Sequence, residues 1–134
     1  MAAVADPILS RIPPAALSTF TRLLKKEARG LDVLRRSVDR YLEVIEEAAQ
    51  TRTHINADLA RRIAAACHGL LDVHDGVSTQ DQARIVAAVE YFLLPRDGDD
   101  DLAYQDGLDD DAAVVTAVAE ALGRDDLRVD LVAN

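Results

Sequence analysis

Apolar residues recur at intervals of three and four along most of this 134-residue chain, and this spacing constrains the fold more than any other feature. Residues 31–48 show it most clearly. One helical face there carries Leu31, Leu34, Val38, Tyr41, Leu42, Ile45 and Ala48. A period near 3.6 residues is typical of an amphipathic α-helix, and no alternating βαβ pattern accompanies it. The spacing therefore predicts an all-α fold.

Helix start and stop signals divide the chain into about five such segments. Pro is tolerated in a first helical turn, Gly favours helix ends, and the residue before a Pro avoids helical geometry. We expect a first helix after Pro13-Pro14 that stops near Gly30, a second capped by Asp32 and a third capped by Asn56. A fourth helix is expected to open with the capping box Ser78–Asp81 and to end at Leu94, before Pro95. A fifth is expected over Ala112–Leu122, stopped by Gly123.

These segments predict apolar faces that can meet in one core. The faces carry Leu17, Phe20, Leu23 and Leu24; Leu59, Ile63, Cys67, Leu70 and Leu71; Ala83, Val86, Val89, Phe92 and Leu93; and Val114, Val115, Val118, Ala121 and Leu122. The length suits a single domain. We expect a bundle of about five helices over residues 13–134, after an N-terminal arm at 1–12 that makes contacts through Ile8, Leu9 and Ile12. The tail with Leu127 is either extended or a final helical turn.

Charge is distributed unevenly between the two halves of the chain. Residues 1–67 hold eleven Lys and Arg against eight Asp and Glu, whereas residues 68–134 hold four against sixteen. An acidic half repels phosphate and anionic lipid headgroups, so nucleic-acid binding is not expected. The basic set comprises Arg22, Lys25, Lys26, Arg35, Arg36 and Arg40. It is either a solvated face or a surface that receives an acidic partner, including another copy of this protein.

Cysteine usage and hydropathy indicate the compartment. The only cysteine, Cys67, excludes an internal disulfide or a cysteine-based zinc site within one chain, and its Ala-rich surroundings suggest a core position. No apolar run approaches the ~20 residues that a membrane span requires. The N-terminus also lacks the layout of a secretion signal. We expect a protein of the reducing cytoplasm without a transmembrane segment.

The connection before the last helix is the best functional candidate, because residues 95–111 hold eight aspartates in seventeen positions. Together with the preceding helix it resembles the YkvA-like family of small bacterial domains of unknown function. The resemblance covers roughly residues 84–122. It depends on the spacing of Tyr91, Pro95, Asp97, Asp101, Gly107, Asp110 and Asp111. Gly98-Asp99-Asp100 stands where the family usually has apolar residues and a second proline. The resemblance implies a helical fold and a shared motif, but no reaction.

We favour an architectural role for the aspartates. In this interpretation Asp97 and Asp101 shape the turn, and Asp109 or Asp110 caps the last helix, where a carboxylate accepts backbone N–H bonds. Gly107 then supplies a positive φ angle.

The main alternative is a Ca²⁺ or Mg²⁺ site, since a hard cation relieves repulsion between clustered carboxylates. Its expected ligands are Asp97, Asp101, Asp110 and Asp111. It is not an EF-hand, because Leu102 and Leu108 occupy the positions that require Gly and Glu. A third, weaker interpretation is an enzyme that uses paired carboxylates as acid and base. The sequence holds no HExxH, GxSxG or P-loop string to support it.

The remaining polar candidates are expected to be structural. His54 and His68 are predicted at the surface, and His74 partly buried near a helix end. None of them has a second His four residues away, so the sequence does not suggest a pair of metal ligands. Tyr104 is predicted to anchor the aspartate-rich loop. The sequence therefore predicts a non-enzymatic helical module, structural or acting through protein contacts, without a required cofactor.

Overall fold

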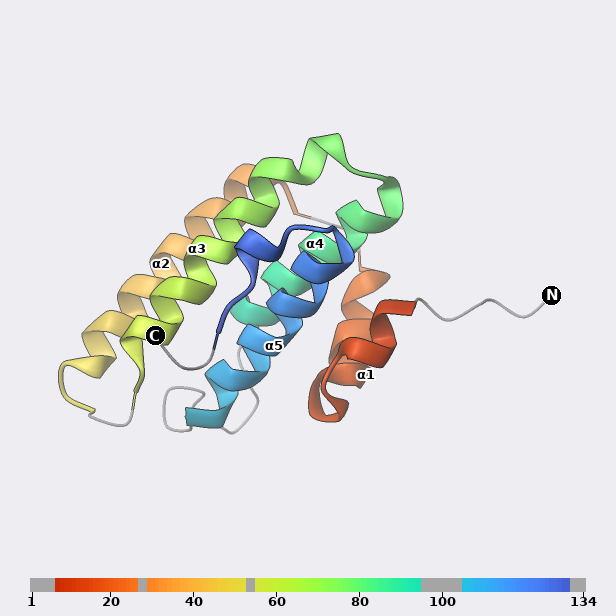
Figure 1. Ribbon diagram of the computed structural model, residues 1–134. Coiled ribbons are helices and arrows are strands. Elements are labelled where there is room, and N and C mark those ends of the chain that lie inside the picture. The colour runs from red at the N-terminus through yellow and green to blue at the C-terminus, as the bar shows by residue number, and fades with distance from the viewer. Residues whose placement is uncertain (1–6, 27–28, 53–54, 95–104, 131–134) are drawn as a thin grey trace.

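The structure, a computed structural model, describes residues 7–26, 29–52, 55–94 and 105–130, with side chains from residue 108 onward in the last range. Its helices are α1 (Pro14–Leu24), α2 (Leu31–Ala49), α3 (Ala57–Val73), α4 (Thr79–Leu93) and α5 (Gln105–Ala121), joined by 3₁₀ turns η1 (Pro7–Arg11), η2 (His74–Gly76) and η4 (Asp125–Leu127). Those ranges contain no strand. The prediction of an all-α, single-domain bundle of about five helices is confirmed (Figure 1).

Helix α4 lies at the centre of the bundle and packs against each of the other four α-helices. The antiparallel pair α2 and α3 lies on one side of it, and α1 lies on the other (Figure 1). Every residue from Ile85 to Phe92 is buried, whereas the sequence predicted one buried face with Val86 and Val89. Neighbours on all sides cover the remaining positions. Ala87 and Ala88 suit this place because small side chains allow close helix packing.

Several predicted helix ends are confirmed. The Asn56 side chain accepts a hydrogen bond from the Leu59 N–H (2.9 Å) and caps α3, and Ser78 accepts one from the Asp81 N–H (3.1 Å) and caps α4. Leu94 has extended backbone geometry and ends α4 one residue before Pro95. Gly123 has a φ of 72°, the left-handed geometry that favours glycine, and terminates α5.

Two predicted boundaries near α2 are wrong. Helix α1 ends at Leu24, well before Gly30, and Gly30 itself is the N-cap residue of α2. Asp32 therefore lies in the first turn of α2 instead of capping it. The chain leaves α1 early because Lys26 and Arg29, in the α1–α2 connection, both bind Glu90 on α4.

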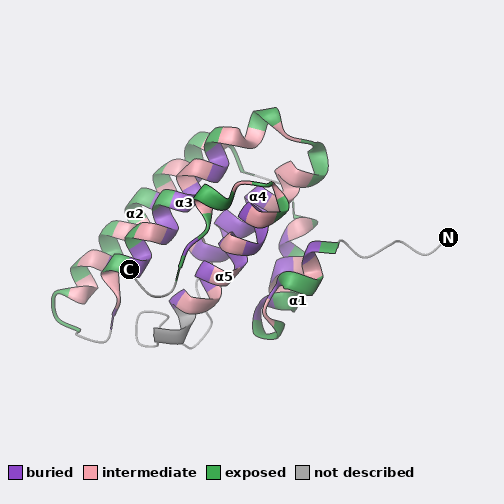
Figure 2. Ribbon diagram, in the orientation of Figure 1, coloured by how far each residue is buried: buried purple, intermediate pink, exposed green. Residues whose placement is uncertain are grey.

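Both ends of the described chain contribute buried residues to the core (Figure 2). Ile8 and Ile12 are buried in it, as the sequence predicted. At the other end, the η4 turn is followed by extended backbone, and Val129 is buried. The Thr116 hydroxyl holds this segment by accepting the Val129 N–H (2.9 Å) and donating to its carbonyl (3.2 Å).

Candidate functional site

Asp109 and Asp110 do not cap α5. Helix α5 begins at Gln105, so Asp109 and Asp110 lie in its second turn and the backbone of Gly107 is helical. The predicted cap and the positive φ at Gly107 are both wrong. The physical reason is that the apolar face of α5 extends back to the buried Leu108, which precedes Ala112 by four residues. One more turn of helix buries that leucine.

Asp110 and Asp111 occupy different environments. Successive helical residues point about 100° apart, and Asp111 is buried whereas Asp110 is partly exposed. Burial, followed by the negative charge of Asp111, raises the pKa of the Cys67 thiol. Cys67 is therefore an uncharged core residue, as the sequence predicted.

The predicted cation site is only partly covered by the structure. Asp97 and Asp101 lie outside the described residues, so the four-aspartate site stays a prediction. Within the described residues, no group of three or more His, Cys, Asp or Glu side chains is placed to hold a metal ion. His54 and Tyr104 also lie outside the described ranges.

Glu90 is a buried charge that the sequence interpretation did not single out. Its side chain is 4% exposed, and it receives Lys26 Nζ at 2.8 Å and the guanidinium of Arg29. Burial pushes the pKa of Glu90 upward, but the hydrogen bonds and positive charges of Lys26 and Arg29 outweigh it and hold that pKa below its ordinary value. The available signal was one carboxylate inside the apolar run Ile85–Leu94, which predicts a buried partner.

The described histidines have structural partners. His68 is 30% exposed, and its Nε2 lies 2.7 Å from Asp39 Oδ1, so the residue joins α3 to α2 at the surface. His74 is partly buried at the end of α3, as predicted, with Nδ1 3.1 Å from Asp75. Neither histidine belongs to a group of metal ligands within the described residues.

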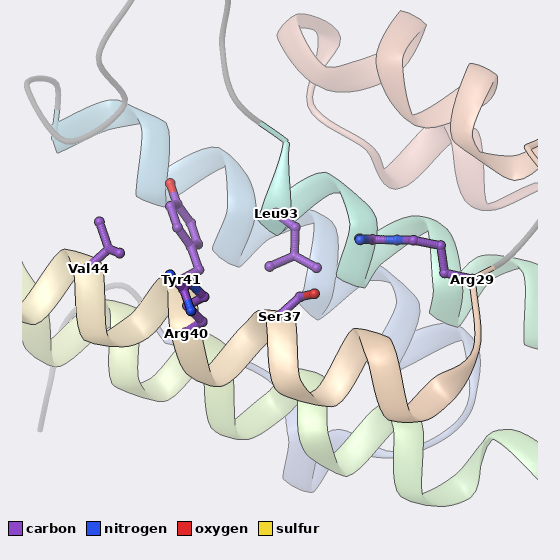
Figure 3. A pocket seen from close by; sticks show the side chains of 6 residues that line it. All are labelled: Arg29, Ser37, Arg40, Tyr41, Val44 and Leu93. Atoms are coloured by element: carbon purple, nitrogen blue, oxygen red, sulfur yellow. The ribbon is translucent and has the colours of Figure 1, made fainter.

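A shallow hollow of about 330 Å³ lies between α2 and the end of α4, and we call it the α2–α4 hollow. Its lining residues are Arg29, Ser37, Arg40, Tyr41, Val44 and Leu93 (Figure 3). The Tyr41 ring packs edge-on against Phe92, with 5.1 Å between ring centroids. Val44 and Arg29 lie toward opposite ends of the hollow. These residues provide apolar contacts and hydrogen-bond donors, but no nucleophile with an adjacent base.

The side of α2 that faces away from α3 and α4 stays open to solvent, and we call it the α2 outer face. It carries Val33 and Val44, which are 39% and 47% exposed. Valine is normally placed inward on an amphipathic helix, so its presence among the charged residues was the signal in the sequence that could have located this surface.

Comparison of the chain with protein-family models, curated proteins and solved structures gives no match. Of the positions that carry the YkvA-like resemblance, Tyr91 is buried in α4, and Gly107, Asp110 and Asp111 lie in α5. The others lie outside the described residues, and the resemblance stays a prediction. Across the described ranges, no helix combines the length and the hydrophobicity that a membrane crossing requires.

Proposed function

We propose that this protein is a non-enzymatic interaction module that binds another protein chain through the α2 outer face and the adjoining α2–α4 hollow. The observation that carries the proposal is that α2 exposes two valines, Val33 and Val44, and that Val44 also lines a hollow with the apolar side chain of Leu93. A single exposed apolar residue needs no explanation, but apolar side chains grouped on one side and rimmed by polar groups are typical of interaction surfaces.

The polar groups of the hollow support the same proposal. Tyr and Arg are the residue types enriched at protein interfaces, because each combines a large contact area with directional hydrogen bonding. Arg29 already forms an ion pair with Glu90. Arg40 is exposed and has no ion pair among the described residues, so its guanidinium remains available to a partner.

The wider context of the proposal comes from the sequence. We include a cytoplasmic location, supported by the single cysteine in the sequence. We also include a YkvA-like relationship, supported by the spacing from Tyr91 to Asp111. An acidic second half argues against nucleic acid as the partner.

Photo-cross-linking in the cells that make the protein tests this proposal. Benzoyl-phenylalanine replaces Val44 in one variant and Leu17 in the control. Leu17 is a matched position because it is a 37% exposed apolar residue on α1, across the bundle from α2. We expect discrete protein adducts from position 44 and not from position 17. Absence of an adduct at position 44, or the same adducts from both positions, would contradict the proposal.

A further inference from the structure

The charged residues of α2 fall into two groups that differ in their partners. Three of them pair with α3, through Arg35–Asp72 (2.8 Å), Glu46–Arg61 (2.6 Å) and Asp39–His68 (2.7 Å). Five others are exposed and have no ion pair in the described part of the chain: Asp32 in the first turn, and then Arg36, Arg40, Glu43 and Glu47. The second group therefore carries charge that the folded monomer does not use.

The last four of these, from Arg36 to Glu47, form one line on the α2 outer face, and we call it the charged stripe. Their spacings of four, three and four residues place them within an arc of about 60° on the helix surface. The stripe runs from two cations in the N-terminal half of α2 to two anions in the C-terminal half. Val33 and Val44 lie along one side of it.

The order of these charges gives a single helix little net stabilisation. Arg36–Arg40 and Glu43–Glu47 are like-charge pairs at i,i+4, which destabilise an isolated helix. Asp32–Arg36 at i,i+4 and Arg40–Glu43 at i,i+3 are opposite in charge and offset these pairs. Anions near a helix C-terminus also oppose the macrodipole, and the last turn of α2 contains no basic residue. The stripe therefore adds little to the stability of the monomer.

We propose that the charged stripe binds the same stripe of a second copy of this protein, with the two α2 helices antiparallel. This inference rests on the proposed function and names its partner. In one register Arg36 faces Glu47 of the second copy, and Arg40 faces its Glu43. Along the helix axis, the two-fold axis then lies level with the midpoint between residues 41 and 42. Each like-charge pair gains opposite charges, and the contact is closed, as homodimer interfaces usually are.

The size of the contact makes this dimer reversible. Helix α2 spans 19 residues, or about 28 Å, so a helix pair buries less area than the standard 1,200–2,000 Å² interface. Exposed ion pairs are individually weak and are screened by salt. Val33 and Val44 add apolar area beside the stripe. We therefore expect association that weakens as the salt concentration rises.

Sedimentation equilibrium of the full chain, with charge-reversed variants, tests the inference. The double variants R36E/R40E and E43R/E47R each give the stripe a single sign of charge. Each alone should associate more weakly than the unmodified protein, by roughly tenfold or more. An equimolar mixture of the two should associate again, because every facing pair is then opposite in charge. Circular dichroism and thermal unfolding check that both variants stay folded.

A monomer at every protein and salt concentration would overturn the inference, as would a mixture that fails to restore association. Variants that still associate like the unmodified protein would also overturn it. The cross-linking experiment distinguishes failure of this inference from failure of the proposed function. If position 44 cross-links only to a different protein, the function stands and the second copy is excluded. An adduct with the mass of two chains supports both.

Discussion

Helices α2 and α4 show two ways in which one bundle places charge. Helix α4 is surrounded by the other four α-helices, and its residues from Ile85 to Phe92 are all buried. Helix α2 packs mainly against α3 and α4, and among its residues Leu34, Val38 and Ile45 are fully buried. Position in the bundle, more than helix length, decides how many faces of each helix the core uses.

The two helices also differ in how their carboxylates are satisfied. Glu90 on α4 is buried, so the chain brings Lys26 and Arg29 to it, because an unpaired buried charge is costly. Glu43 and Glu47 on α2 remain in solvent and need no partner for folding. The buried charge of Glu90 is therefore paired within the fold, whereas the exposed charges of the stripe have no ion pair among the described residues.

The largest expected effect comes from truncating a core side chain of α4. Phe92→Ala removes a fully buried ring that also contacts Tyr41, and we expect a loss of about 3–5 kcal/mol in the free energy of unfolding. Val44→Ala on the α2 outer face should change it by less than about 0.5 kcal/mol. Urea denaturation measures both. Similar losses for the two variants would mean that α2 is as much part of the core as α4.

A smaller effect is expected from neutralising Glu90. Glu90→Gln should lower the free energy of unfolding by about 1–2 kcal/mol, less than for a fully buried ion pair, because Lys26 and Arg29 are 50% and 40% exposed and regain water. Glu43→Gln on the charged stripe is the matched control and should be nearly neutral in the monomer. Equal losses in the free energy of unfolding for the two variants would contradict the distinction between paired charge on α4 and exposed charge on α2.

The stabilisation that Glu90 provides should also depend on pH, and the variant Glu90→Gln can measure this. Because the pKa of Glu90 is lowered by folding, its ionised form stabilises the native state above the unfolded pKa of about 4.3, and this stability disappears as the pH falls through the lower folded value. The difference in unfolding free energy between the unmodified protein and Glu90→Gln should be constant from pH 7 to pH 5 and shrink below pH 4. A difference that grows on acidification would contradict the ion-pair account.

The smallest expected effect concerns divalent cations. With Asp110 and Asp111 on different sides of α5, we expect the melting temperature to stay the same in a chelator and in millimolar Ca²⁺ or Mg²⁺. A cation that binds only the folded protein must raise that temperature. A rise that Asp110→Asn abolishes would support the alternative site of Asp97, Asp101, Asp110 and Asp111.

Local signals predicted much of this fold because they act within a few residues. The caps at Asn56 and Ser78 and the glycine stop at Gly123 depend on neighbouring backbone groups, and each is confirmed. The boundaries that failed depend on distant contacts. Helix α1 ends early because its connection reaches Glu90, more than sixty residues away in sequence.

The candidate site was harder to predict for a related reason. The aspartates near α5 are the most conspicuous polar cluster in the sequence. Their spacing, however, does not reveal that the helix extends back past Leu108 or that Asp111 is buried. The open side of α2 depends on which of its faces α3 and α4 cover. Only Val33 and Val44, out of place among charged residues, marked it in the sequence.

Distances between spin labels on two copies test the central claim, that the α2 outer face binds a second copy in antiparallel orientation. Cys67 is buried and its pKa is raised, so labels attach to an introduced cysteine instead. In the proposed register the backbone separation between copies is about 12 Å at position 44 and about 27 Å at position 33, from helix rise and spacing.

We therefore expect the Val44→Cys label pair to give a clearly shorter distance than the Val33→Cys pair, measured by electron–electron double resonance. The difference arises because residue 44 lies nearer the two-fold axis than residue 33. Equal distances at both positions would indicate parallel helices. No coupling between copies at either position, at concentrations where the protein should associate, would contradict the account.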